Sequence, residues 1–408
     1  MLKVGGIEAE ALAEQFGTPL YVYDAEVVRG QYQKLKEHLP QFEIYYSLKA
    51  NGSLALARIL AAQGAGAEIA SSGELVLAQA AGFPPEKIIF AGPGKNLPEL
   101  EAAVQAGILC FNAESTRELE RLEEIGSRLN KKIICALRIN TLEGAEAQEQ
   151  MVGGPSKFGW DQERVVAELK DLLPRLEQVE VRGIHIYTAS GVLDPDALLA
   201  NARRTVEVAK TLSEELNFPL ELVNFGGGFG VPYFSHEEPL DLEFLGRGLE
   251  RLLAEKKFAV PRLLYELGRF LVAPAGFFLT RIIDIKQSRG QNFAITDGGM
   301  NQFLRPVFMD LNHPTVVANK LDRSPDTIYQ LGGPCCTPID FLARDLKLPQ
   351  LEVGDLIAIG NAGAYGFSMS MLYFLGHKLP AEVLVDGGEA RLVRLRGEDG
   401  DCLVNQLA

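Results

Sequence analysis

The run that decides the fold begins at residue 42 and reads Phe42-Glu-Ile-Tyr-Tyr-Ser-Leu-Lys-Ala-Asn51. Aromatic and β-branched residues fill its first half, which is typical of a buried strand. Seven further runs of this kind follow, at 67–70, 87–91, 108–112, 132–139, 181–187, 221–225 and 262–266. Amphipathic stretches with apolar residues at helical spacing lie between them, at 99–106, 115–129 and 197–217 among others. Eight strands alternating with helices predict a (β/α)8 barrel of the TIM type.

The pattern changes after residue 275. Strand-like runs then follow one another with turns rich in Gly, Pro and Asp and with little helix, at 280–287, 291–297, 326–331, 355–360, 380–385 and 390–396. This is typical of an antiparallel β-domain. We therefore expect a barrel domain over residues 26–275 and a β-domain built from residues 1–25 plus 276–408, which the early run 20–24 would join.

Charge and composition exclude several classes of protein. The net charge of −14 argues against a nucleic-acid or anionic-membrane partner. The sequence has no apolar stretch long enough to span a membrane and no secretory signal at its start. Its five scattered cysteines do not form a disulfide framework. We expect a soluble cytoplasmic protein, and we assign no metal site.

Ionisable and polar side chains collect where the predicted barrel strands end. One such residue would usually be an ordinary surface residue, but a whole set in one register predicts an active site, because active sites of such barrels lie on the C-terminal rim. The set comprises Lys49, Glu68, Arg138, His185, Tyr187 and Glu266.

Three consecutive glycines follow the seventh strand, in the run Asn224-Phe-Gly-Gly-Gly-Phe-Gly230. Glycine backbone can offer its N–H groups to an anion with no side chain in the way. We expect a phosphate to bind at this turn; the alternative is a merely flexible turn.

Two charged groups near the barrel mouth need chemical partners. An amine such as that of Lys49 at the end of an apolar strand must lose its charge or find an anion, and a Schiff base with an aldehyde removes the charge. A buried carboxylate such as Glu266 needs a cation. A protonated pyridine nitrogen would serve, and an internal ion pair with Arg269 is the alternative.

At these residues the chain resembles the fold-type III pyridoxal-phosphate decarboxylases, the family of diaminopimelate, ornithine and arginine decarboxylases. The resemblance covers nearly the whole chain and implies an alanine-racemase-like fold. The matching motifs are Ser47-Leu-Lys-Ala-Asn51, Gly66-Ala-Glu-Ile-Ala-Ser-Ser-Gly-Glu74, Gly226-Gly-Gly-Phe-Gly230, Glu266-Leu-Gly-Arg269, Gly333-Pro-Cys-Cys336 and Gly363-Ala-Tyr365.

The resemblance implies roles for individual residues. Lys49 would hold the cofactor, Glu266 would keep its pyridine nitrogen protonated, and Glu68 stands where the family usually has an aspartate. Cys336 would reach into the partner subunit's site of a head-to-tail homodimer and deliver a proton, although its neighbour Cys335 is an alternative. The remaining cofactor-binding residues would be Arg138, His185, Tyr187, Ser190, Gly227, Gly228, Arg269 and Tyr365, with Arg269 near the phosphate or the substrate.

Several residues depart from the family pattern. Tyr187 takes the place of the histidine that usually stacks on the cofactor ring. Thr337 follows the cysteine where diaminopimelate decarboxylases carry a glutamate, and Tyr373-Phe replaces their Tyr-Asn. These departures resemble the branch that includes the carrier-protein-bound glutamyl decarboxylase of butirosin biosynthesis. Arg305-Pro306 is retained from the diaminopimelate enzymes, so Arg305 either binds a substrate carboxylate or lies on a surface loop.

The resemblance therefore predicts decarboxylation of an amino-acid α-carboxylate. The lost glutamate favours a substrate with a neutral distal end, such as a glutamyl group on a carrier protein; Arg305, Thr337, Tyr373 and Arg269 are the candidate substrate contacts. The alternatives are meso-diaminopimelate decarboxylation in lysine biosynthesis and a non-catalytic relative that binds the cofactor or a regulatory partner. A racemase of the alanine type is disfavoured, because those enzymes place an arginine where this chain has Glu266.

Overall fold

The computed structural model describes residues 1–141, 149–150 and 154–407. The chain forms two compact units. The barrel unit comprises residues 31–232 and 238–270, and the β-rich unit comprises residues 1–30, 233–237 and 271–408. Among the helices of the described residues, none has both the length and the apolar character that crossing a bilayer requires.

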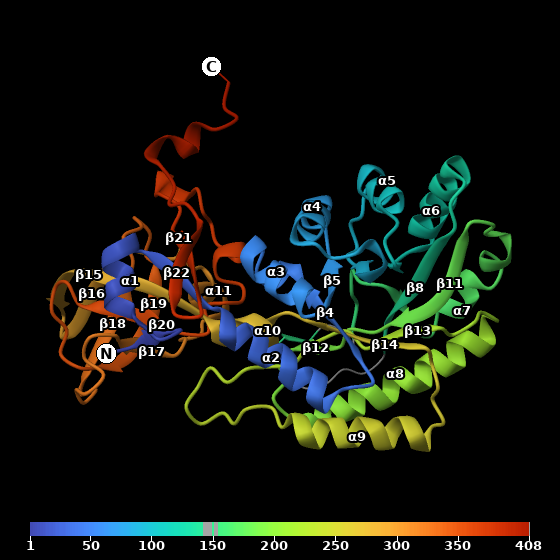
Figure 1. The fold of residues 1–408 in the computed structure, drawn as a ribbon, viewed down its shortest axis with the longest axis horizontal. Helices are drawn as coiled ribbons and strands as arrows, with labels where there is room; N and C mark the ends of the chain where they lie inside the picture. The colour runs from blue at the N-terminus through green and yellow to red at the C-terminus, as the bar shows by residue number, and fades with distance from the viewer. Residues whose placement is uncertain (142–148, 151–153, 408) are drawn as a thin grey trace. The chain divides into compact units, whose positions relative to one another are not determined.

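The barrel unit is built on a closed ring of eight parallel strands (Figure 1). Strand β14 pairs with β4 and closes the ring. In ring order the strands are β4 (Glu43–Ser47), β5 (Gly66–Ile69), β6 (Ile88–Phe90), β7 (Cys110–Ala113), β8 (Ile133–Asn140), β11 (Val179–His185), β13 (Leu222–Asn224) and β14 (Arg262–Leu267). Short strands β10 (Trp160–Asp161), β9 (Glu149–Gln150) and β12 (Ala189–Ser190) lie outside the ring order. Every predicted run falls on a strand, so the predicted (β/α)8 barrel is confirmed.

Helices connect successive strands of the ring. Three helix starts carry the expected capping residues, since the side chains of Ser71, Asn96 and Ser115 each accept a hydrogen bond from a backbone N–H three residues on. The helices are α2 (Ala25–His38), α3 (Leu54–Ala62), α4 (Ser72–Ala81), α5 (Leu97–Ala106), α6 (Thr116–Leu129), α7 (Val165–Leu169), α8 (Pro195–Glu215), α9 (Leu242–Glu255) and α10 (Arg269–Val272). The stretches predicted as helical at 99–106, 115–129 and 197–217 correspond to α5, α6 and α8.

Apolar side chains fill the interior of the ring, so the barrel is a packed core rather than a channel. The central cluster consists of Tyr45, Ile89, Cys110, Ala136, Leu222 and Leu264. The Tyr45 ring occupies the space beside Gly66, where an added Cβ would lie 2.4 Å from that ring. The packed layer leaves only the carboxyl ends of the strands for polar chemistry.

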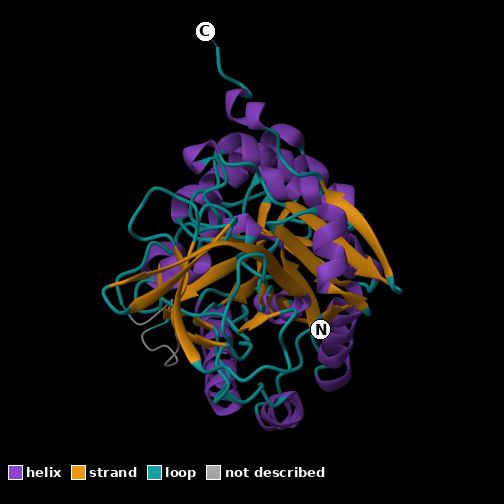
Figure 2. Ribbon diagram, turned by 90° about the vertical axis from the view of Figure 1, so that its left-hand side faces the viewer, coloured by secondary structure: helices purple, strands orange, loops and turns teal. Residues whose placement is uncertain are grey.

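In its described residues, the β-rich unit contains a mixed sheet and a separate antiparallel pair of short strands, β1 with β2; strands are drawn in orange in Figure 2. Its strands are β1 (Lys3–Val4), β2 (Ile7–Glu8), β3 (Leu20–Asp24), β15 (Gly276–Ser288), β16 (Gln291–Thr296), β17 (Thr315–Val317), β18 (Thr327–Gly332), β19 (Phe341–Leu348), β20 (Leu356–Ile359), β21 (Ala381–Asp386) and β22 (Glu389–Arg394). Most pairings are antiparallel, as expected. However, β16 runs parallel to β18 and β21 runs parallel to β3, so the expectation of a wholly antiparallel domain is corrected to a mixed sheet.

Long-range pairing joins the two ends of the chain within this unit. Strand β3 lies between β15 and β21. Helix α1 (Ala9–Phe16) contributes Leu12 and Ala13 to a core shared with residues from β15, β20 and β21. Helix α11 (Arg305–Met309) lies in the C-terminal part of the unit. The core depends on residues near both termini, which no local pattern reveals.

Candidate active site

Lys49 lies at the carboxyl end of the first barrel strand, in a short 3-10 turn (Leu48–Ala50) that follows β4. Its Nζ is 3.1 Å from Glu68 Oε1 of the neighbouring strand β5. The Lys49 side chain is 39% exposed, whereas that of Glu68 is only 1% exposed. A buried carboxylate therefore orients the amine of a side chain that is itself partly exposed.

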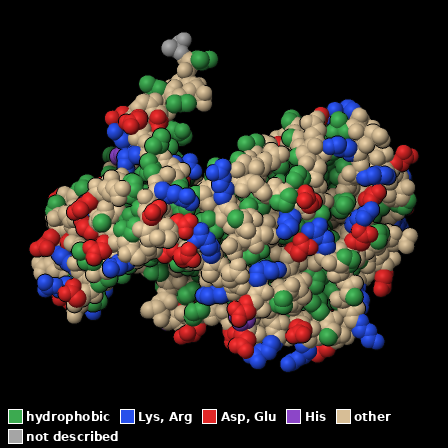
Figure 3. Space-filling model, in the orientation of Figure 1, with side chains coloured by type: hydrophobic (Ala, Val, Ile, Leu, Met, Phe, Trp, Pro, Cys, Tyr) green, Lys and Arg blue, Asp and Glu red, His purple; other side chains and the backbone are tan. Residues whose placement is uncertain are grey.

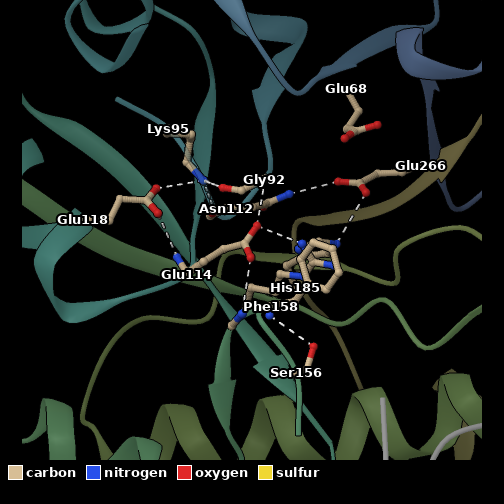
Figure 4. A network of polar contacts seen from close by, with 12 residues as sticks. Glu68, Gly92, Lys95, Asn112, Glu114, Glu118, Ser156, Phe158, His185 and Glu266 are labelled. Atoms are coloured by element: carbon tan, nitrogen blue, oxygen red, sulfur yellow. Dashed lines mark hydrogen bonds and ion pairs between the residues drawn. The ribbon is translucent and has the colours of Figure 1, made fainter. Parts of the chain in front are cut away.

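Glu266 is held by several polar side chains in the barrel (Figure 4). Its Oε1 accepts hydrogen bonds from the side-chain amides of Asn112 (2.9 Å) and Asn224 (2.6 Å). Its Oε2 lies 3.4 Å from His185 Nε2. Burial raises the pKa of Glu266, but the His185 imidazole, the Lys49 ammonium and the Asn224 amide together outweigh this and lower it to about 2. Glu266 is thus held as an anion.

Tyr187 follows β11 and lies beside Lys49, whose Nζ is 5.7 Å from the centre of the tyrosine ring. Burial raises the pKa of Tyr187, and the opposing effects of the Lys49 charge and a hydrogen bond with Ser190 do not cancel this rise. The phenol is therefore a neutral group at physiological pH. An aromatic face next to the amine suits stacking against a planar ring.

The glycine run after β13 forms a tight loop. A Cβ on Gly227 would lie 2.0 Å from the Glu266 carbonyl oxygen, and one on Gly228, whose φ is +103°, would lie 2.4 Å from the Ala189 carbonyl oxygen. No side chain fits at either position. Among the described residues, neither the Gly227 nor the Gly228 amide donates to a backbone acceptor. Both residues are partly exposed, so their N–H groups are available to an anion.

Arg269 and Ser190 meet near this loop, with Arg269 Nη2 3.4 Å from Ser190 Oγ. The ion pair between Glu266 and Arg269 that the sequence left open is not among the contacts of the described residues. Arg269 instead adds a nearly buried positive charge beside the glycine loop. A phosphate is the kind of anion that such a cation and two backbone amides bind.

Arg138 is engaged with a neighbour rather than directed at the amine. Its Nη1 donates to Glu114 Oε1 at 2.8 Å, and its guanidinium stacks on the Phe158 ring at 4.3 Å. Glu114 also accepts a hydrogen bond from the Gly92 amide. Figure 4 shows Glu114 in contact with Gly92 in this network.

The two adjacent cysteines of the β-rich unit have different environments. Cys335 is buried, and its Sγ lies 3.2 Å from Asn301 Oδ1. Its backbone N–H donates to Asp340 Oδ2 at 2.7 Å. Cys336 is exposed. Burial, and to a lesser degree the Asp340 carboxylate, raises the pKa of Cys335 to about 12.

The other predicted residues of the β-rich unit also differ in accessibility. Arg305 is only 1% exposed, with Nη1 2.8 Å from His313 Nε2 and its guanidinium 4.4 Å from the centre of the Tyr233 ring. It does not lie on a surface loop, so that alternative is wrong. Tyr373 is largely exposed, and Thr337 and Tyr365 are partly exposed, Tyr365 with a left-handed φ of +54°.

Sequence reasoning missed several residues of the site. Asn112 and Asn224 stand at the carboxyl ends of β7 and β13, where a polar residue in an apolar run was a usable signal. Nothing in the local pattern marked four buried charged groups near these residues and near Cys335, which are Lys95, Glu114, Glu118 and Asp340.

The barrel residues fit the cofactor that the resemblance implies. Glu68 Oε2 is buried without a hydrogen-bond partner among the described residues, close to the partly open Lys49 amine. The glycine loop with Arg269 suits a phosphate, and the anionic Glu266 suits a protonated ring nitrogen. The three groups that pyridoxal phosphate requires are therefore all present in one unit.

Comparisons with known proteins agree with this chemistry. The family model "Pyridoxal-dependent decarboxylase, pyridoxal binding domain" matches residues 25–273. The L-glutamyl-[BtrI acyl-carrier protein] decarboxylase of Niallia circulans is 38% identical over 98% of this chain and 96% of its own. The diaminopimelate decarboxylase of Methanothermobacter thermautotrophicus is 36% identical over 99% of this chain and 95% of its own. The crystal structure of diaminopimelate decarboxylase from M. jannaschii with L-lysine superimposes with a TM-score of 0.92 at 30% identity, covering 99% of this chain and 95% of that one. The chain therefore belongs to the family of pyridoxal-phosphate-dependent amino-acid decarboxylases.

Proposed function

We propose that this decarboxylase removes the α-carboxylate of a substrate whose distal end carries no ammonium group, such as a glutamyl group tethered to a carrier protein. The observation that carries the proposal is Thr337. It directly follows Cys336, where the diaminopimelate enzymes carry a glutamate. A hydroxyl cannot offer the negative charge that a distal ammonium needs. The 38% identity to a glutamyl carrier-protein decarboxylase supports the same substrate class.

Decarboxylation of meso-diaminopimelate in lysine biosynthesis is the second candidate, and Arg305 and the 36% identical relative favour it. An arginine could bind the distal carboxylate of that substrate. However, the Arg305 guanidinium is buried against His313 and Tyr233 inside its own unit. This environment favours a packing role for Arg305. The presence of Arg305 therefore supports diaminopimelate as the substrate less strongly than Thr337 argues against it.

Pyridoxal phosphate, when bound, supplies the electron sink that accepts the electron pair released as carbon dioxide departs. Lys49 would hold the cofactor through Nζ, and Glu68 would keep that atom oriented. Glu266, held as an anion, would keep a proton on the ring nitrogen. Tyr187 would cover one face of the ring as a neutral aromatic surface.

The phosphate would be bound by residues of the barrel unit. Gly227 and Gly228 would donate their backbone N–H groups, and Ser190 its hydroxyl. Arg269 would supply positive charge. In this arrangement His185 and Arg138 act behind the cofactor, through Glu266 and Glu114 respectively.

Cys336 would deliver the proton that replaces the lost carboxylate at the substrate α-carbon. Of the two adjacent cysteines, only Cys336 is exposed. We further propose that it serves the partner subunit's site in a homodimer, with Tyr373 and Thr337 beside the substrate.

The charge distribution bears on how a carrier protein could be recognised. On the face drawn in Figure 3, Lys and Arg side chains are interspersed with Asp and Glu rather than gathered into one basic patch. On this face, an acidic carrier would find no dominant electrostatic attraction. Recognition would then rest on the tethered aminoacyl group itself, which makes short pantetheine thioesters informative substrates.

The test is carbon dioxide release by the protein loaded with pyridoxal phosphate. The panel holds free meso-diaminopimelate, ornithine, lysine, arginine and glutamate, together with glutamyl thioesters of pantetheine and of a carrier protein. Turnover confined to the thioesters is the expected result. Efficient turnover of free diaminopimelate would contradict the proposal and assign the chain to lysine biosynthesis.

Thr337→Glu is the matched variant, because it restores the acidic group at the decisive position. We expect it to gain activity on diaminopimelate relative to the glutamyl thioester. An unchanged preference would show that Thr337 does not set specificity. Lys49→Ala serves as the negative control, since borohydride should no longer fix the cofactor to the chain.

A further inference from the structure

Glu266 is held from two sides of the barrel. Asn224 belongs to β13, the strand next to β14, which carries Glu266. Asn112 belongs to β7, which stands four strands from β14 in either direction around the ring. Its amide therefore reaches across the barrel interior to the same oxygen, Oε1. Both asparagines are 0% exposed, so both amides lie away from bulk solvent.

A second contact fixes the orientation of the Asn224 amide, and the charge of Glu266 fixes that of the Asn112 amide. Asn224 Oδ1 accepts a hydrogen bond from the Gly226 N–H at 2.9 Å, so its Nδ2 must face Glu266. The opposite orientation of Asn112 would bring its carbonyl oxygen against the carboxylate. Each amide can therefore only donate to Glu266, and two donors on one oxygen stabilise the anionic form.

Contacts from outside the ring also fix the position of the Asn112 backbone. Lys95 Nζ donates to the Asn112 backbone carbonyl at 3.0 Å and to that of Gly92 at 2.6 Å. The Lys95 ammonium is paired with Glu118 Oε1 at 2.9 Å, and its side chain is only 1% exposed. Figure 4 shows the line of contacts from Glu118 through Lys95 and Asn112 to Glu266. The outer ion pair thus fixes the backbone from which Asn112 reaches inward.

We propose that Asn112 and Asn224 are positioning residues that hold Glu266 as an anion in a fixed orientation, and that they thereby keep the ring nitrogen of pyridoxal phosphate protonated. This inference rests on the role proposed above for Glu266. The lowered pKa of Glu266, to which Asn224 contributes, agrees with it. The competing explanation is that the asparagines are ordinary buried polar groups that stabilise the barrel alone.

The experiment compares two cofactors in two proteins. One cofactor is pyridoxal phosphate. The other is its 1-deaza analogue, in which a C–H group replaces the ring nitrogen, so that no protonated nitrogen can interact with the Glu266 carboxylate. The proteins are the wild type and Asn112→Leu, which removes the amide at similar volume. Dissociation constants are measured by equilibrium dialysis. Asn112 is the better target, because Asn224 also binds the Gly226 amide.

We expect Asn112→Leu to weaken pyridoxal phosphate binding roughly tenfold, while affinity for the deaza analogue changes less than twofold. In ¹⁵N NMR of bound, ring-labelled pyridoxal phosphate, the variant should also show partial loss of the nitrogen proton. Equal weakening of both cofactors, or no weakening of either, would overturn the inference, because a purely structural asparagine cannot sense the ring nitrogen.

The two proposals fail in different ways. A wild type that binds both cofactors equally well would refute the proposed role of Glu266 itself. A wild-type preference for pyridoxal phosphate that survives in Asn112→Leu would refute only the positioning role. Thermal unfolding of the loaded protein checks the fold, and Asn112→Ala, which cannot overpack the site, is measured in the same way if the leucine variant does not fold.

Discussion

Cys335 and Cys336 are neighbours in the chain, yet only one of them is suited to proton delivery. The Cys335 thiol is buried against Asn301, and its pKa of about 12 makes it a poor acid near neutral pH. We expect Cys336→Ala to lower kcat about 100-fold and Cys335→Ala to leave kcat within about threefold while costing roughly 1 kcal/mol of stability. Steady-state kinetics and thermal unfolding of both variants measure this. A larger loss of kcat in Cys335→Ala than in Cys336→Ala would reverse the assignment.

The buried phenol of Tyr187 leads to a separate prediction, about the pH dependence of kcat/KM. Because burial raises its pKa, the phenol stays protonated throughout pH 6 to 9, the range assayed, and adds no inflection to the rate profile there. Tyr187→Phe should therefore keep the shape of the wild-type profile of kcat/KM. Tyr187→His should add an inflection near pH 6 to 7, where imidazole titrates. An inflection that disappears in Tyr187→Phe would show that the tyrosine ionises during turnover.

At the scale of elements, the loop after β13 depends on the absence of side chains. An alanine Cβ at position 227 would collide with the Glu266 carbonyl oxygen at 2.0 Å. Gly227→Ala should therefore cost about 1–3 kcal/mol of unfolding free energy and weaken cofactor binding at least about tenfold. Gly94→Ala is the control, because nothing lies within 4 Å of its added Cβ. Normal cofactor affinity in Gly227→Ala would exclude the loop as the phosphate site.

The elements themselves were predictable where the signal was local. Apolar runs of strand length marked all eight ring strands, and apolar residues at helical spacing marked helices such as α5 and α6. Strand direction was not local, because the parallel pairing of β16 with β18 and of β3 with β21 depends on contacts made only in the folded unit. Strand β19 (Phe341–Leu348) was missed because Arg344, Asp345 and Lys347 interrupt its apolar pattern.

Residues of the candidate active site were likewise predictable where the signal was local and not where it depended on long-range contacts. Lys49, Glu68 and Glu266 were identified because chemistry-bearing residues at strand ends are visible in the sequence. That Asn112 meets Glu266 could not be predicted, since it requires two strands on opposite sides of a closed ring. The sequence also could not show that Arg138 is paired with Glu114, because a buried ion pair has no signature in either residue's local run.

At the scale of the whole molecule, the proposed catalytic residues are divided between two units of the chain. Lys49 and Glu266 belong to the barrel unit, whereas Cys336 and Tyr365 belong to the β-rich unit. In a head-to-tail homodimer, each site would combine the barrel of one subunit with Cys336 of the other. Two inactive variants, each defective in a different unit, would then form mixed dimers in which one of the two active sites is intact.

This arrangement gives a quantitative prediction. A reassociated 1:1 mixture of Lys49→Ala and Cys336→Ala should regain about a quarter of wild-type activity, since half of the dimers are mixed and each has one intact site of two. A mixture of Lys49→Ala and Glu266→Ala is the control and should stay inactive, because both defects lie in the barrel. Carbon dioxide release from the reassociated mixture measures the outcome, and affinity-purified mixed dimers should show about half of wild-type activity. Mixed dimers that form but stay inactive in the first pairing would mean that Cys336 serves the site of its own chain.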